Sequence, residues 1–199
     1  MNLILVRHGE TEFNRQERIL GLGLEPLNAR GQAQAVAVAS VISSDSPSIL
    51  YSSPVVRAIQ TAEVIAARSS IRVKLLPAVA ELDSGQVEGL TIVQLQQQFP
   101  DVLQAWRENP AVAVMPDGES LADVQKRAWI SVKDITKRHS DDNVVIVAHN
   151  FSIQTILCKC LDIPLKNFRQ LRIDLGSITR IRVIDSVFTL LTLNDTSHL

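Results

Sequence analysis

The chain alternates between short apolar runs and longer stretches in which polar residues or alanines recur. The short runs predict buried strands at residues 3–6, 48–52, 72–76 and 144–148. The longer stretches predict helices at 31–44, 55–68, 91–99, 101–108, 121–138 and 151–161. Two final apolar segments, 177–184 and 187–193, flank a turn at Asp185 and Ser186 and predict a terminal strand pair.

This order of elements predicts an α/β fold. Strands that alternate with helices favour a mainly parallel sheet covered on both faces, so we expect a three-layer α/β/α domain with the terminal pair as an antiparallel edge. Residues from about 80 to 118 contain two helices split by Pro100 and predict a helical insertion over the carboxyl rim of the sheet. Ser120, with Asp123 three residues later, predicts the capped start of the next helix. No linker or repeat is visible, and a single domain over 1–199 is expected.

Composition and charge narrow the function classes. The 199 residues are 46% hydrophobic and 21% charged, and the net charge is −1, so no basic excess favours nucleic acid or an anionic membrane. No apolar stretch is long enough to span a bilayer, and no signal sequence opens the chain. Cys158 and Cys160 lie two apart in a predicted helix, which is neither a redox pair nor a disulfide framework. We therefore expect a cytoplasmic protein.

Polar residues follow several strands at the point where each apolar run ends. Arg7 and His8 follow the first strand, Arg57 follows the second in SSPVVRAIQTA, and His149 follows the strongest one in VIVAHN. Ligands in open α/β sheets bind beyond the carboxyl ends of the strands, so these side chains are expected to meet at one rim. Two of the four histidines thus occupy equivalent places after strands.

These residue types fit phosphoryl transfer. Arginine forks match phosphate oxygens, and a neutral histidine can attack phosphorus. Nearby arginines disfavour an imidazolium, so they favour an unprotonated His8. His149 and Asn14 can donate to phosphate oxygens, and Glu81 can protonate the leaving alkoxide, with Asp83 as the second choice.

Plainer interpretations exist for each residue taken alone. A histidine at a strand end is more often structural, an arginine within a helix such as Arg57 is usually exposed, and Glu81 could be an ordinary loop carboxylate. His139 and His198 have no such context and are expected in solvent. No spacing typical of a metal site is present, and arginines beside the histidines would repel a cation. The fit of all the strand-end residues to one chemistry favours the catalytic interpretation.

Several blocks in the same order carry a family resemblance. LVRHGETEFN, PLNARGQAQA, YSSPVVRAIQTAE, ELDSGQVEGLT, PDGES and VIVAHN resemble the phosphoglycerate-mutase-like branch of the histidine phosphatase superfamily. The resemblance implies that His8 becomes a phosphohistidine and that Glu81 protonates the leaving group and then activates water. It implies that Arg7, Arg57 and His149 hold the phosphoryl group. Asn14, Gly21 and Asn150 would contact phosphate or substrate, and no metal or cofactor is required.

The chain departs from the family pattern at four places. Phe13 stands where tryptophan is frequent, Leu20 where glutamine often precedes Gly21, Leu24 where aspartate is frequent, and Asn150 where glycine is common. None of these changes removes a catalytic group. The leucines replace residues expected to face substrate, so they bear on substrate identity.

Three functions share this pocket. A metal-independent phosphomonoesterase acting on a small phosphorylated metabolite is favoured, because no arginine-rich aromatic lid lies between Glu81 and Gly118. A cofactor-dependent phosphoglycerate mutase is the alternative, and a non-catalytic phosphate-binding regulator is a third possibility. The segment 87–115, with Phe99, Trp106, Met115 and few cations, slightly favours a small or partly apolar leaving group, although these residues could equally form the insertion's own core. The terminal strand pair offers an edge for a homodimer.

Overall fold

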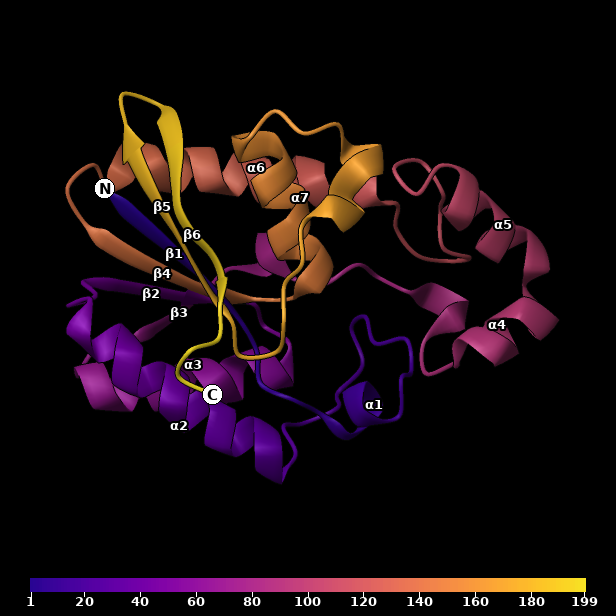
Figure 1. Cartoon of the computed structure of the whole chain (residues 1–199), viewed down its shortest axis with the longest axis horizontal. Coiled ribbons are helices and arrows are strands. Elements are labelled where there is room, and N and C mark those ends of the chain that lie inside the picture. The colour runs from indigo at the N-terminus through magenta and orange to yellow at the C-terminus, as the bar shows by residue number, and fades with distance from the viewer.

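Strands β1 (Asn2–Arg7) and β4 (Asn143–Ala148) lie at the centre of a six-stranded sheet in the computed structural model, which describes all 199 residues (Figure 1). The strand order is β3-β2-β4-β1-β5-β6. The remaining strands are β2 (Ile49–Ser52), β3 (Val73–Leu75), β5 (Ile178–Ile184) and β6 (Val187–Asp195). Strands β3, β2, β4 and β1 run parallel, whereas β5 and β6 are antiparallel. The predicted parallel sheet with an antiparallel edge is confirmed.

Helices cover both faces of the sheet. Helices α2 (Ala29–Ser44) and α3 (Val56–Ser69) lie on one face, and α6 (Leu121–Arg138) and α7 (Asn150–Cys160) lie on the other (Figure 1). Alternate residues of β1 serve the two faces: Leu3 and Leu5 join the core beneath α6 and α7, and Ile4 and Val6 join the core beneath α2 and α3. This two-sided burial explains why the strand is continuously apolar.

The helix starts follow local sequence. Ser120 and Asp123 form the predicted capping box of α6. Asn28 caps α2, with its Oδ1 accepting from the amide of Gly31 at 2.9 Å. Pro54, expected in the first turn of its helix, lies just outside it because Val55 is the N-cap of α3. Pro100 is the first residue of α5, a position where its missing N–H costs no hydrogen bond.

Short helices gather at the carboxyl end of the parallel strands. Figure 1 shows α1 (Glu12–Arg15), α4 (Ile92–Gln98) and α5 (Pro100–Glu108) beyond this end of the sheet. Three 3₁₀ turns complete the fold: η1 (Pro77–Val79), η2 (Gly85–Val87) and η3 (Leu165–Gln170). None of these three turns was predicted, because a single 3₁₀ turn leaves no clear period in the sequence. No helix combines the length and apolar character that crossing a membrane requires.

The two remaining histidines are only partly exposed, whereas the sequence predicted them in solvent. His139 is partly buried, with Nδ1 2.8 Å from Asp142 Oδ2 and Nε2 3.1 Å from the Tyr51 hydroxyl. His198 is partly buried, with Nε2 3.0 Å from the carbonyl oxygen of Gly176. The contacts with Tyr51 and Gly176 join residues distant in sequence, so local context gave no indication of them.

Candidate active site

The pairing of β1 with β4 brings the two strand-end histidines together. Arg7 is the register partner of Ala148, so His8 and His149 follow the two strands at the same level. The amide of His8 donates to the Ala148 carbonyl at 3.1 Å. The two imidazole rings are 5.0 Å apart between centroids and tilted by 59°. Both side chains are buried, as a preorganised site at the end of rigid strands requires.

His8 is held as a neutral imidazole with Nε2 unprotonated. Its Nδ1 lies 2.7 Å from the Gly9 carbonyl oxygen, which can only accept, so Nδ1 carries the proton. Nε2 accepts a hydrogen bond from Nε of Arg57 at 3.1 Å. Burial, together with the charges of Arg57 and Arg7, holds the pKa of His8 well below its usual range. A lone pair on Nε2 is the state that a nucleophile toward phosphorus needs.

Arg57 lies on the buried face of α3, not on its surface. It shares that face with Ala58, Thr61 and Ile65, at helical spacing, and is fully buried. Besides His8, the guanidinium donates to the carbonyl of Gly21 at 2.7 Å and to that of Gly23 at 3.2 Å. Burial lowers the pKa of Arg57 to about 10, so the group remains charged at neutral pH.

The loop that receives Arg57 is held from its other side by Glu88. The Glu88 carboxylate accepts from the amide of Gly21 at 2.9 Å and from that of Gly23 at 3.3 Å. A Cβ on Gly21 would lie 2.5 Å from the Leu82 carbonyl oxygen, so only glycine fits there. Because the Gly21 amide is already bonded, phosphate contact by Gly21 stays a prediction.

His149 is fixed by a residue that the sequence interpretation did not single out. Its Nε2 lies 2.7 Å from Oγ of Ser53, the residue that follows β2. Nδ1 of His149 is buried and has no hydrogen-bond partner. Burial and the charge of Arg57 hold the pKa of His149 well below its ordinary value. Ser53 belongs to the SSP stretch, directly after β2. Its position at a strand end was the one feature of the sequence that could have marked it as a site residue.

Arg7 retains free hydrogen-bonding capacity. One guanidinium nitrogen, Nη1, donates to the Ile173 carbonyl at 2.6 Å, and Nε is buried without a partner. Burial lowers the pKa of Arg7, and the charges of Glu81 and Asp174 act in the opposite direction. An unsatisfied N–H beside the two histidines can bind an anionic oxygen.

Glu81 is buried against the first turn of α7, directly after His149. Its carboxylate accepts from the amides of Phe151, at 3.1 and 3.2 Å, and of Ser152, at 3.2 Å. A third donor is the amide of Leu82 at 2.9 Å. Burial raises the pKa of Glu81, while these backbone donors and the two arginines partly offset the rise. A carboxyl group with a raised pKa is suited to giving a proton to a leaving group.

The other predicted residues have local roles. Asn14 closes the capping box of α1, with its Oδ1 3.1 Å from the amide of Thr11. Asn150 begins α7 and donates from Nδ2 to Gln154 Oε1 at 3.1 Å. Asp83 accepts from the Gly85 amide at 3.0 Å and shapes the loop after Glu81. Their contact with substrate stays a prediction.

The aromatic residues of the segment 87–115 join the protein core. Trp106 packs edge-on against Phe151 and Phe168, at centroid distances of 5.5 and 5.8 Å. Phe99 packs against the same cluster, and Met115 is a buried member of it. The structure therefore favours the second of the two interpretations, in which these side chains serve packing.

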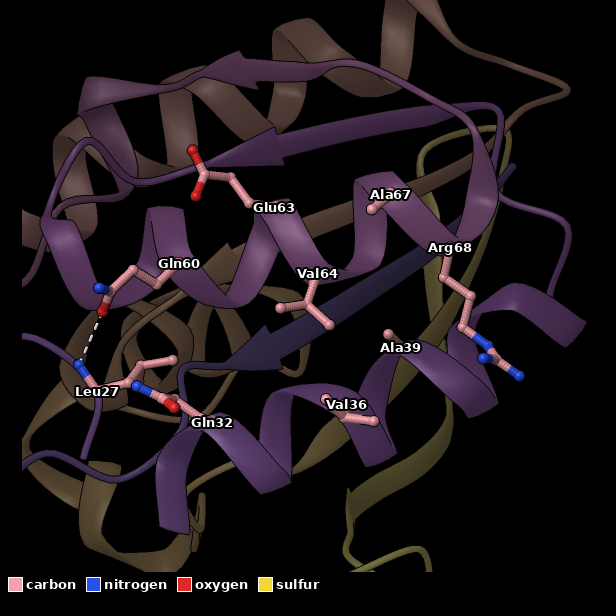
Figure 2. A pocket seen from close by; sticks show the side chains of 9 residues that line it. All are labelled: Leu27, Gln32, Val36, Ala39, Gln60, Glu63, Val64, Ala67 and Arg68. Carbon is pink, nitrogen blue, oxygen red and sulfur yellow. Dashed lines mark hydrogen bonds between the residues drawn. The ribbon is translucent and has the colours of Figure 1, made fainter. Parts of the chain in front are cut away.

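A separate groove lies away from these residues. It has a volume of about 790 Å³ and runs between α2 and α3, with Val36, Val64 and Arg68 among the side chains that line it (Figure 2). The Leu27 amide donates to Gln60 Oε1 at 2.8 Å at one end of this groove. None of the strand-end residues lines it. No group of three or more histidine, cysteine, aspartate or glutamate side chains has a geometry that would hold a metal ion.

Comparisons with known proteins find relatives along the whole chain. Residues 3–196 match the sequence model of the histidine phosphatase superfamily (branch 1). Phosphoserine phosphatase 1 of Hydrogenobacter thermophilus is 32% identical over 100% of this chain and 94% of its own. The probable phosphoglycerate mutase GpmB of Proteus mirabilis is 31% identical over 100% of this chain and 95% of its own. The solved structure of Bacillus stearothermophilus YhfR superposes with a TM-score of 0.94 at 29% identity, covering 99% of this chain and 98% of that one.

Proposed function

Because this chain belongs to branch 1 of the histidine phosphatase superfamily, we propose that His8 is the nucleophile of its reaction. The protein is an enzyme of the phosphatase type that acts on small phosphorylated metabolites. The observation that carries the role of His8 is its contact with Arg57: Nε2 is unprotonated and accepts from a buried guanidinium. That arrangement supplies a lone pair and a phosphate-binding cation at one point.

The proposed reaction has two steps and uses no metal. His8 Nε2 forms a bond to phosphorus as the bond from phosphorus to the ester oxygen breaks, and Glu81 gives its proton to the departing alkoxide. In the second step Glu81 takes a proton from water, which attacks the phosphohistidine and releases inorganic phosphate. When substrate binds, Arg57 donates to phosphate oxygens. It then gives up its hydrogen bonds to the His8 ring nitrogen and to the Gly21 and Gly23 carbonyls. Arg7, His149 and Asn14 bind the remaining charge.

The test of this mechanism is removal of the nucleophile. His8→Ala should lower turnover of p-nitrophenyl phosphate by several orders of magnitude and abolish a phosphoenzyme trapped by alkaline quenching. His139→Ala is the matched control, since His139 lies outside the site and bonds Tyr51 and Asp142. Near-normal activity in His8→Ala would overturn the proposal, and no turnover by the unaltered protein between pH 5 and 8 would favour the phosphate-binding regulator.

The mutase alternative is weaker than hydrolysis. A mutase must exclude water, and the segment 82–117 is short and has no arginine-rich lid. We propose that this part of the predicted 80–118 cap leaves the site open to water. Adding 3-phosphoglycerate with a bisphosphoglycerate primer tests the point, because isomerisation faster than phosphate release would favour the mutase.

We propose a substrate with a single phosphate group and a small leaving group, of the kind that the name of the Hydrogenobacter relative indicates. The loop whose carbonyls bind Arg57 exposes Leu22 and Leu24, the latter by 86%, where a polyanion would need cations. A panel of phosphoserine, sugar phosphates and a ribazole phosphate, ranked by kcat/KM, tests this. A preference for substrates with several phosphates would contradict it.

Two further predictions concern the protein in the cell. A homodimer through β6 is proposed because this strand ends the sheet and pairs only with β5. Light scattering after gel filtration measures it. The cytoplasmic location predicted from the sequence is tested by cell fractionation.

A further inference from the structure

Every N–H of the Arg127 guanidinium, on α6, is hydrogen-bonded. The acceptors are backbone carbonyls of residues 78–81, the segment that includes Glu81, and the carboxylate of Glu119. Nη1 donates to the carbonyls of Ala78 and Ala80 at 2.7 and 2.8 Å, and Nη2 donates to the carbonyl of Glu81 itself at 2.8 Å. The remaining donors bind Glu119, at 2.9 Å from Nε and 2.8 Å from Nη2. A guanidinium has five N–H groups, so none is left over for solvent or substrate.

Arg127 and Glu119 together form a clamp on the backbone around Glu81. Glu119 binds the chain just after Glu81. Its Oε2 accepts from the amide of Asp83 at 3.1 Å, and its own amide donates to the carbonyl of Asp83 at 3.0 Å. The backbone is therefore held at Glu81 and again two residues later. Arg127 and Glu119 are each about a quarter exposed, so solvent only partly screens the pair.

The clamp fixes the backbone of Glu81, while the first turn of α7 receives the carboxylate. The same turn begins directly after His149, so the position of the Glu81 backbone sets where the carboxyl stands relative to both histidines. We propose that Arg127, with Glu119, is a positioning residue for proton transfer by Glu81. This inference rests on the proposed function, in which Glu81 protonates the leaving group. A misplacement of about 1 Å in such a group can cost on the order of 100-fold in rate.

The test compares leaving groups that differ in their need for a proton. In single-turnover experiments, Arg127→Lys should slow phosphoryl transfer from phosphoserine roughly 10- to 100-fold more than transfer from p-nitrophenyl phosphate. Lysine keeps the charge but has three donors, so it cannot make all five bonds. Arg138→Lys is the matched control, because Arg138 lies on the same helix, is about half exposed and pairs only with Asp134. It should leave both rates unchanged.

A double-variant cycle separates positioning from general damage to the fold. In a Glu81→Gln background, Arg127→Lys should lower the rate with phosphoserine by less than about three-fold further. Both substitutions impair the same proton transfer, from Glu81 to the leaving group, so their effects should not multiply. Glu119→Gln provides a second route with a milder change, and it should show the same dependence on leaving group. This variant keeps the proposal testable if Arg127→Lys does not fold.

Two results would overturn the inference: equal slowing of both substrates, or losses that multiply fully in the double variant. Failure of the proposed function looks different. In that case the unaltered enzyme forms no phosphohistidine, or Glu81→Gln itself shows no dependence on leaving group. The positioning role would be rejected, and the proposed function kept, by one further result. In it, Glu81→Gln shows the expected dependence on leaving group, but neither Arg127→Lys nor Glu119→Gln does.

Discussion

Nε of Arg57 donates a hydrogen bond to Nε2 of His8 across 3.1 Å, and both side chains are buried. The two residues come from different elements, the end of β1 and the first turn of α3. The contact does two things in the absence of phosphate. It favours the His8 tautomer with an unprotonated Nε2. It also holds the Arg57 guanidinium beside Nε2, the atom that is proposed to attack phosphorus.

Arg57→Lys should damage both stability and activity. A lysine cannot bond His8, Gly21 and Gly23 together in the same geometry, and its ammonium would be left partly unsatisfied in a buried place. We expect a loss of about 2–3 kcal/mol in the free energy of unfolding and a fall of roughly 10²–10³ in kcat. Urea unfolding and turnover of p-nitrophenyl phosphate measure these effects. Arg68→Lys, on the exposed end of the same helix, should change neither.

Glu81→Gln should make the rate depend on the leaving group. Its amide cannot supply the proton, so transfer from phosphoserine should slow on the order of 10²-fold while transfer from p-nitrophenyl phosphate changes little. In the unaltered enzyme, the phosphoserine rate should fall as the pH rises through the raised pKa of Glu81, because the carboxyl then loses the proton it donates. Single-turnover rates between pH 5 and 8 test both statements. Equal slowing of the two substrates would instead point to Asp83 as the acid.

The neutral state of His8 should make stability depend on pH. Burial and the arginines lower the pKa of His8 in the folded protein, so below its ordinary value of 6.5 the unfolded chain binds a proton that the folded protein does not. Stability from this source is therefore present above pH 6.5 and lost as the pH falls. One such histidine contributes at most about 1.4 kcal/mol per pH unit. Urea unfolding of the protein and of His8→Asn between pH 7 and 5 should give a shallower slope for the variant. Parallel curves would contradict the assignment.

Gly21→Ala should open the loop that holds Arg57. The added methyl group would meet the Leu82 carbonyl at 2.5 Å and Ser84 Oγ at 2.6 Å, so the loop must shift. We expect a cost of about 1–3 kcal/mol in stability, with a fall in kcat/KM. Gly23→Ala is a milder comparison, because its only close contact is the end of the Glu88 side chain at 2.8 Å, which can shift more readily than the Leu82 backbone. Equal effects of the two substitutions would show that the backbone contact is unimportant.

Much of the fold was predictable because the relevant forces act locally. The continuous apolar run of β1 identified a strand buried on both faces, and Ser120 with Asp123 marked the start of α6. Among the residues proposed for the site, Arg7, His8 and His149 share one simple property. Each stands where an apolar strand ends, and parallel strands bring such ends to one rim.

Other parts of the site depend on contacts between distant residues. The place of Arg57 after β2 predicted that it lies at the rim, but its hydrogen bonds to His8, Gly21 and Gly23 appear only in the structure. Glu88 and Arg127 act through the Gly21 loop and the Glu81 loop, and neither stands at a strand end. Trp106 could have lined the substrate site or the core, and only its packing against Phe151 and Phe168 decided for the core.

The sequence by itself determined the elements, the parallel character of the sheet and the class of chemistry gathered at its carboxyl rim. These properties follow from the hydrophobic periodicity and from the residue types at strand ends. Both are visible in short stretches of sequence. The tertiary structure decided which ring nitrogen of His8 carries the proton, the burial of Arg57 and the placement of the Glu81 carboxyl at the start of α7. Burial and charge fix such states, and both depend on which distant segments pack together.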